Sequence, residues 1–138
     1  PTAANDFLLR ESFRRILASS AVATCDEERL VMYDAADELA TEGIHAHVLH
    51  VPSIKPLDEA AIVEAADKTG RVVTAEDHTI IGGLGGAVAE VLGEQRPTPM
   101  KRVGIRDTFG ESAANDDLLT KYGLTSGHVA QAAREILA

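Results

Sequence analysis

The segment from Glu76 to Gly86, EDHTIIGGLGG, combines residue types that could do chemistry with glycines that bend a backbone. Gly82, Gly83, Gly85 and Gly86 fill four of five consecutive positions there, between an expected strand end and an expected helix start. The free N–H groups and the positive end of a helix dipole would favour a phosphate or a carboxylate. Alternatively, the glycines permit close packing of the helix against the sheet or another subunit.

Two phosphate-binding signatures are incomplete in this segment. No Gly-Lys-Ser/Thr ending follows the glycines, as a P-loop requires. The pair Gly83-x-Gly85 is followed by Val88, where the dinucleotide-binding fingerprint needs Gly or Ala. The sequence therefore favours a packing or interface role over an anion site.

Glu76, Asp77 and His78 form a polar trio at the expected end of a strand. A histidine beside two carboxylates is suited to acid–base catalysis or to metal binding. However, neighbouring residues of an extended segment point in alternating directions, so the three side chains cannot converge on one atom. We expect hydrogen bonds that anchor the loop rather than catalysis.

Arg106 lies in the turn after the last expected strand. Its guanidinium could bind a carboxylate or a phosphate, or it could pair with Asp107, Glu111 or the Glu76 loop. The sequence alone leaves both possibilities open.

Three histidines and one cysteine complete the set of candidate ligands. His45 and His47 would share one strand face while His50 faces the other way, which leaves at most two metal ligands. We therefore expect surface or helix-covered histidines. The single cysteine, Cys25, has acidic neighbours that disfavour a reactive thiolate, and it cannot form an internal disulfide.

Alternating strand and helix patterns must position these residues. Strands are expected over 16–25, 44–54, 71–75 and 100–105, and helices over 26–43, 59–68, 87–95, 115–122 and 126–137. Asp58 is a suitable N-cap and Gly70 a suitable C-cap for the second helix. The pattern predicts an α/β fold with three layers, α/β/α, around a mostly parallel sheet. Ligands of such sheets bind at the carboxyl ends of the strands, which are here the loops 25–27, 53–58, 76–86 and 106–114.

Composition narrows the class of protein. The chain has 138 residues, which fits a polar lead-in over 1–15 and one domain over 16–138. A net charge of −9 argues against a nucleic-acid partner. The apolar runs are too short to span a bilayer, so no membrane partner is expected. With one cysteine and nothing that resembles a signal peptide, we expect a cytoplasmic location.

Four motifs in order resemble the C-terminal domain of transketolase. They are KPLD at 55–58, VVTAEDHTIIGGLGGAVAEVL at 72–92, KRVGIRDTFGES at 101–112 and LLTKYGLT at 118–125. AADELATEGI at 35–44 extends the match. Looser forms of these motifs mark the related domains of deoxyxylulose-phosphate synthase and of the 2-oxo-acid dehydrogenase E1 β subunit. Residues 7–34 match poorly, and Cys25 stands where the family usually has a glycine.

The resemblance implies a mainly parallel sheet of about five strands, packed beside a pyrimidine-binding domain. It also implies that thiamine diphosphate and a divalent metal lie in the enzyme's other domains, because the Gly-Asp-Gly…Asn cofactor motif is absent from this sequence. We therefore expect no catalytic, cofactor or metal-binding residue in this chain, and an isolated chain that is inactive. Expected partners are the N-terminal and pyrimidine-binding domains of the same enzyme, or a split subunit, in a homodimer.

Two functions from different classes follow. The leading one is a non-catalytic assembly domain of a transketolase-type enzyme that transfers a two-carbon ketol unit between sugar phosphates. It would be either a split subunit or a fragment of a longer chain, and the equivalent domain of the two related enzymes is an alternative. The other is a self-standing regulatory domain that binds a small anion. The residues that either function would use for an anion or an interface are Glu76, His78, Gly82, Gly83, Gly85, Gly86 and Arg106.

Overall fold

The computed structural model describes residues 15–21 and 26–138 as alternating strands and helices. The elements are β1 (Arg15–Ala21), α2 (Asp26–Ala40), β2 (His45–His50), α3 (Glu59–Thr69), β3 (Val72–Thr79), α4 (Leu84–Gln95), β4 (Met100–Ile105), α5 (Asn115–Tyr122) and α6 (Ser126–Leu137). The expected lead-in over 1–15, apart from Arg15, which begins β1, lies outside the described residues, as does Cys25.

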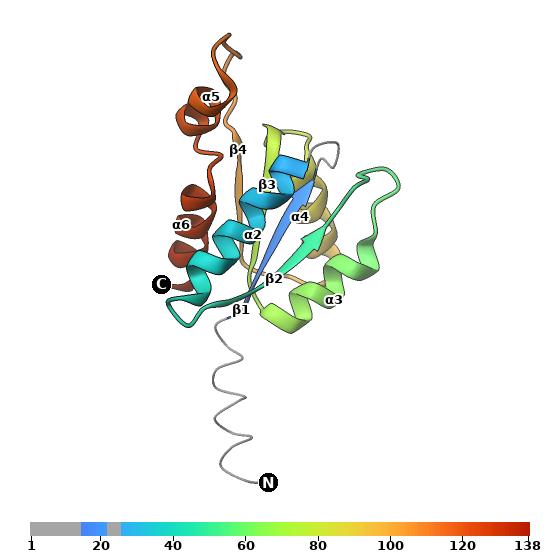
Figure 1. The fold of residues 1–138 in the computed structure, drawn as a ribbon. Coiled ribbons are helices and arrows are strands. Elements are labelled where there is room, and N and C mark those ends of the chain that lie inside the picture. The colour runs from blue at the N-terminus through green and yellow to red at the C-terminus, as the bar shows by residue number, and fades with distance from the viewer. Residues whose placement is uncertain (1–14, 22–25) are drawn as a thin grey trace, which may run out of the picture.

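The four described strands form one parallel sheet in the order β2-β1-β3-β4. Helices α2 and α6 cover one face, and α3 and α4 cover the other (Figure 1). This three-layer α/β/α arrangement confirms the predicted fold class, and the described residues supply four of the about five strands that the resemblance implies. Because all strands run parallel, the loops after β2, β3 and β4 lie at one edge of the sheet.

Strand β3 contributes to the cores on both faces of the sheet. Val73 and Ala75 are buried with residues of α2 and α6. Val72 is buried with residues of α3 and α4. Successive side chains of a strand alternate between faces, so Thr74 and Glu76 point toward the same layer as Val72. The buried stretch ends at Glu76, and the next two side chains are exposed.

Helix α3 has the caps that the sequence predicts. The Asp58 carboxylate accepts a hydrogen bond from the N–H of Ala61 at 3.0 Å. Gly70 closes the helix with a φ of 68°, a left-handed conformation that costs glycine little. Both caps lie within a few residues of the helix that they end, which is why the sequence shows them.

Several element boundaries differ from the sequence expectation, including the end of α2, which lies at Ala40 rather than beside Gly43. Strand β2 ends at His50 rather than at 54, because the Pro52–Pro56 stretch cannot continue the ladder. Strand β3 continues to Thr79 instead of ending at 75. Helix α4 begins at Leu84, three residues before the expected start, so the last two glycines of the segment lie inside the helix.

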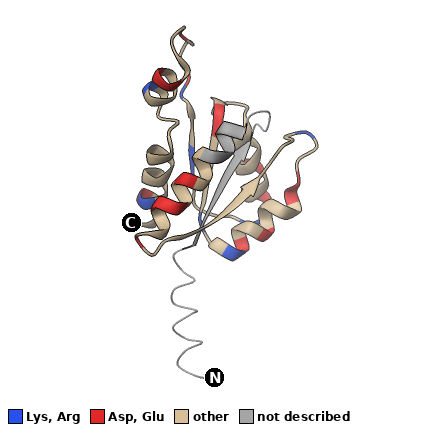
Figure 2. Ribbon diagram, in the orientation of Figure 1, with Lys and Arg blue, Asp and Glu red and all other residues tan. Residues whose placement is uncertain are grey.

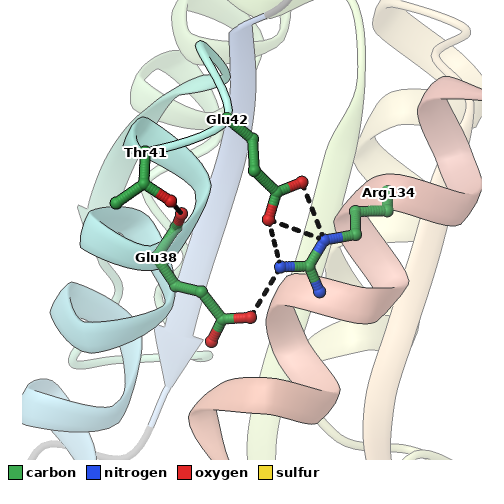
Figure 3. A network of polar contacts seen from close by, with 4 residues as sticks. All are labelled: Glu38, Thr41, Glu42 and Arg134. Carbon is green, nitrogen blue, oxygen red and sulfur yellow. Dashed lines mark hydrogen bonds and ion pairs between the residues drawn. The ribbon is translucent and has the colours of Figure 1, made fainter.

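Helices α2 and α6 are joined at the surface by Arg134. Its guanidinium donates hydrogen bonds to Glu38 at 2.6 Å and to both carboxylate oxygens of Glu42 at 3.1 Å (Figure 3). The hydrogen bonds with Arg134 lower the pKa of Glu42 below its ordinary range. In turn they raise the pKa of Arg134, which stays charged. This clamp ties the C-terminal helix to the start of the domain.

Candidate functional site

The sequence-predicted site is a junction between β3 and α4, which we define as residues 76–85. Glu76 is buried, with an exposed fraction of only 4%. Its Oε2 accepts a hydrogen bond from the N–H of Leu84 at 2.7 Å, and its Oε1 accepts one from the N–H of Gly85 at 2.9 Å. The carboxylate therefore occupies the N-terminus of α4, where a negative charge interacts favourably with the helix dipole.

An irregularity in the sheet begins directly after Ala75, next to Glu76. Ala75 pairs with Val103, but the next pairing joins Thr79 to Ile105, so β3 has two extra residues over this stretch. Such bulges redirect side chains at the ends of strands. Here the bulge accompanies a change from the buried Glu76 to exposed side chains at the two residues that follow.

Gly83 leaves the space that the Glu76 carboxylate fills. A Cβ at position 83 would lie 2.0 Å from Oε2 of Glu76 and 2.6 Å from the backbone oxygen of Thr79. Gly83 is also the N-cap residue of α4 and has no side chain to cap the helix. Glu76 supplies the missing cap from the neighbouring strand.

Two further glycines permit close packing around the same carboxylate. A Cβ at Gly85 would lie 2.7 Å from Cδ of Arg102 and 2.9 Å from Oγ1 of Thr74. A Cβ at Gly104 would lie 2.7 Å from Cγ2 of Ile80 and 3.1 Å from Cγ of Glu76. Gly104 was not among the sequence candidates, although a glycine inside a strand is a known sign of close approach.

The other two candidate glycines have no close neighbours. Gly82 has a φ of 72°, so it supplies the left-handed turn that the junction needs before the helix. A Cβ at Gly86 would meet nothing within 4 Å. The four glycines thus serve two close approaches and one turn, and the fourth has no steric requirement.

The remaining candidates do not join Glu76. The side chains of Asp77 and His78 are exposed, which agrees with the prediction that the trio does not converge. Arg106 is exposed, and its Nη2 donates to the backbone oxygen of Arg102 at 3.2 Å. The guanidinium that lies against the junction is that of Arg102, whose Nη1 donates to the backbone oxygen of Ile80 at 3.0 Å.

The histidine-rich strand shows no metal site. His45, His47 and His50 are all exposed on β2, which forms one edge of the sheet. Across the described residues, no group of three or more His, Cys, Asp or Glu side chains is placed to hold a metal ion. Within the same part of the chain, no helix has the length and apolarity needed to cross a membrane.

The internal carboxylate of Glu76 limits what the junction can bind. A helix N-terminus of this kind attracts anions because its N–H groups have no partner within the helix. In this chain, the first N–H groups of α4 already bind an internal carboxylate. A phosphate or diphosphate would have to displace Glu76 from a buried position, so the junction does not fit an external anion.

Comparisons with known proteins place this geometry in a family. The model of the transketolase C-terminal domain family matches residues 26–129. A 6-deoxy-6-sulfo-D-fructose transketolase subunit of Clostridium sp. is 54% identical over 102 residues, which cover 74% of this chain and 32% of that protein. A 1-deoxy-D-xylulose-5-phosphate synthase of Heliobacterium modesticaldum is 37% identical over 137 residues, which cover 99% of this chain and 20% of the synthase.

A solved structure agrees with these relatives. It is described as a split gene transketolase, inactive beta4 tetramer, and is 44% identical with a TM-score of 0.82. The match covers 90% of this chain and 39% of that one. The chain therefore spans a third or less of the two curated relatives above and about two fifths of the matching structure.

Proposed function

The chain belongs to the transketolase C-terminal domain family, and we propose that it serves as the non-catalytic assembly domain of a transketolase-type enzyme. In this proposal the complete enzyme transfers a two-carbon ketol unit between sugar phosphates. The chain contributes a rigid α/β scaffold rather than a reacting group. We also propose a cytoplasmic location, because a chain with a single cysteine cannot form the internal disulfides that are typical of oxidising compartments.

The occupied junction is the observation that carries the proposal. Glu76 fills the N-terminus of α4, which is the position in this chain best suited by sequence to bind a phosphate. An assembly domain needs such a junction only for packing, whereas an anion-binding regulatory domain needs its N–H groups free. The geometry therefore supports the assembly function over the regulatory alternative.

The same observation bears on the cofactor. Thiamine diphosphate carries two phosphates, and a divalent metal would need carboxylate or other oxygen ligands beside them. The junction of this chain does not fit that group, and the described residues provide no cluster of metal ligands. This supports the proposal that the cofactor and its metal are bound by other domains of the enzyme.

We further propose that the partners are the N-terminal and pyrimidine-binding domains, in the same polypeptide or as a separate subunit, and a second copy of this chain. The share of each relative that the chain covers supports this, because most of each relative lies outside the matched region. The matching structure is described as a tetramer of a split-gene product, which is consistent with self-association of such chains.

A chimeric subunit tests the proposal. The 102-residue matching segment of the Clostridium subunit is replaced by the corresponding residues of this chain, and the chimera is combined with the remainder of that enzyme. Assembly and ketol transfer from 6-deoxy-6-sulfo-D-fructose to an aldose phosphate acceptor are then measured. We expect the chimera to assemble and to remain active. A chimera that folds and assembles but has lost transfer activity would contradict a non-catalytic role.

Isothermal titration provides the matching test on the chain itself. We expect neither thiamine diphosphate with Mg²⁺ nor inorganic phosphate to bind the isolated 138-residue chain. Saturable binding of phosphate that is lost in Arg106→Ala would instead support the regulatory function.

A further inference from the structure

The arm after β4, which we define as residues 106–122, is packed differently from the helix that follows it. Every side chain from 106 to 117 is exposed, and α5 contains no buried residue. Figure 1 shows α5 and the loop before it beyond the carboxyl ends of the strands, whereas α6 lies alongside the sheet. Because the arm buries little apolar surface, the hydrophobic effect contributes little to its folded state.

Helix α5 also lacks features that stabilise a short helix. It has eight residues, Asn115–Tyr122, and isolated helices of that length are marginal in water. Its N-cap residue is Ala114, whose side chain cannot accept a hydrogen bond from the first turn. Figure 2 shows acidic residues at the start of the helix and a basic residue at its end. These charges interact favourably with the helix dipole, but they lie in solvent, where such interactions are weak.

Polar contacts join the arm to itself more than to the sheet. The hydroxyl of Tyr122 donates to the backbone oxygen of Phe109 at 3.3 Å, and Lys121 pairs with Glu111 at 2.6 Å. Among the contacts between described residues, one side-chain hydrogen bond leads from the arm to the rest of the fold, and it is the bond that Arg106 donates to the backbone of β4. The loop and the helix of the arm are therefore connected, and we expect them to move together.

The backbone has a left-handed conformation near both ends of the arm. Asp107 has a φ of 33°, and Gly123, directly after the arm, has a φ of 71°. Such a φ is strained for a residue with a side chain, so the strain at Asp107 is relieved when the arm opens. Beyond Gly123 the chain is anchored, since Leu124 is buried.

Helix α6 is held by the core and by three other parts of the fold. It buries three residues, Val129, Ala130 and Ala133. The backbone oxygen of Ile136 accepts a hydrogen bond from Arg71, next to β3, at 2.9 Å. Arg134 binds two glutamates of the α2 region, and α6 also forms an ion pair with β4. Helix α6 can therefore stay in place when the arm moves.

We propose that the arm opens and closes as one unit while the sheet and α6 remain folded. Opening gives up few buried contacts and relieves the strain at Asp107, so it costs much less free energy than unfolding the domain. Segments that rearrange on ligand binding or assembly belong to this class of low local stability. The inference concerns the chain by itself and goes beyond the proposed function, so either can fail while the other stands.

Native-state hydrogen exchange of the 138-residue chain, followed by NMR at several low urea concentrations, tests the proposal. The N–H of Leu118 donates to the oxygen of Ala114 at 3.1 Å. After correction for intrinsic rates, this N–H and the later ones of α5 should exchange at one common rate, at least about a hundredfold faster than the slowest of α6. Urea should speed exchange in α6 but leave it nearly unchanged in α5, because opening the arm exposes little new surface.

Two variants separate opening of the arm from unfolding of the domain. Ile62→Val removes a methyl group from the core between the sheet and helices α3 and α4. It should speed exchange in α6 about fivefold and leave exchange in α5 unchanged. Ala114→Ser supplies the missing N-cap and should slow exchange in α5 about fivefold.

Three results would overturn the inference. The first is equal protection of α5 and α6 in the wild type. The second is an Ile62→Val variant in which exchange in α5 accelerates as much as in α6, because the arm would then open only with the core. The third is an Ala114→Ser variant that leaves exchange in α5 unchanged. Both substitutions are small, and the retained protection of the sheet amides reports that each variant is folded.

Discussion

The junction after β3 (residues 76–85) and the arm after β4 (residues 106–122) follow neighbouring strands. They contain similar residues, but the carboxylate is buried in the junction and exposed in the arm. Both contain glycines beside carboxylates and lie where α/β sheets commonly bind ligands. In the junction, the backbone folds back onto the buried carboxylate of Glu76. In the arm, Glu111 pairs with Lys121 in solvent and the nearby Phe109 is fully exposed.

The difference lies in where the backbone N–H groups are directed. In the junction, two N–H groups point at one carboxylate, so any residue that moves Glu76 also uncovers buried donors. In the arm, the polar groups face water and can exchange partners at little cost. The position of a loop in the fold is therefore a weak guide to ligand binding until the partners of its N–H groups are known.

Replacing a glycine by alanine gives the largest expected difference in stability between the junction and the arm. Gly83→Ala places a Cβ 2.0 Å from the Glu76 carboxylate, so Glu76 or the backbone must move. We expect a loss of about 3 kcal/mol in the free energy of unfolding, measured by urea denaturation. Gly110→Ala in the arm is the control, because a Cβ there meets nothing within 4 Å and the change should stay within about 0.5 kcal/mol. Equal effects of the two variants would remove the distinction between the regions.

Neutralising one glutamate in each region gives the next contrast. Glu76→Gln keeps the shape of the side chain but turns an NH₂ group toward one of two N–H donors. We expect a loss of about 2 kcal/mol in the free energy of unfolding. Glu111→Gln breaks the exposed ion pair with Lys121 and should change the free energy of unfolding much less, because solvent screens that pair. A Glu76→Gln variant as stable as the wild type would show that the carboxylate does not cap α4.

The two arginines of β4 and its following turn give a smaller contrast. Arg102→Met removes the hydrogen bond to Ile80 but keeps most of the aliphatic packing against Gly85. We expect a loss of about 1 kcal/mol in the free energy of unfolding. Arg106→Met should change it by less than about 0.5 kcal/mol, because Arg106 is exposed. A larger loss of stability in Arg106→Met than in Arg102→Met would contradict the assignment of Arg102 as the arginine that supports the junction.

The smallest expected effect on stability comes from the exposed clamp that Arg134 forms with Glu38 and Glu42. Because Arg134 lowers the pKa of Glu42, the pair stabilises the folded state above the ordinary pKa of a glutamate, about 4.3. That contribution is lost as the pH falls through the lower pKa of the folded state. The melting temperature of Glu42→Gln should therefore lie slightly below that of the wild type at pH 7, and the difference should disappear at acid pH, below the lowered pKa of Glu42. A constant difference between the two proteins over this pH range would contradict the assignment.

Local signals let the sequence predict most of the fold. The bounds of α5 and α6 agree with the prediction to the residue, since acidic residues or Ser126 begin them and Gly123 separates them. Asp58 and Gly70 predict the ends of α3 in the same way. Each of these signals acts over a few residues and can be read directly from the chain.

The site could be predicted only in part, because its contacts are not local. A capping box joins residues three positions apart, whereas Glu76 caps a helix that begins eight residues later. The bulge between β3 and β4 depends on a partner strand that no single segment specifies. For this reason the glycine-rich segment stands out in the sequence, while the early start of α4 and the role of Gly104 do not.

The occupied junction is the central claim, and amide chemical shifts test it most directly. The signals of the Leu84 and Gly85 N–H groups are followed by ¹H–¹⁵N NMR while inorganic phosphate is added to the wild type and to Glu76→Ala. The account predicts no saturable shift in the wild type, and phosphate-dependent shifts at both N–H groups once the carboxylate is removed. Saturable shifts of these two signals in the wild type would contradict it, because they would show that the N-terminus of α4 accepts an external anion while Glu76 is present.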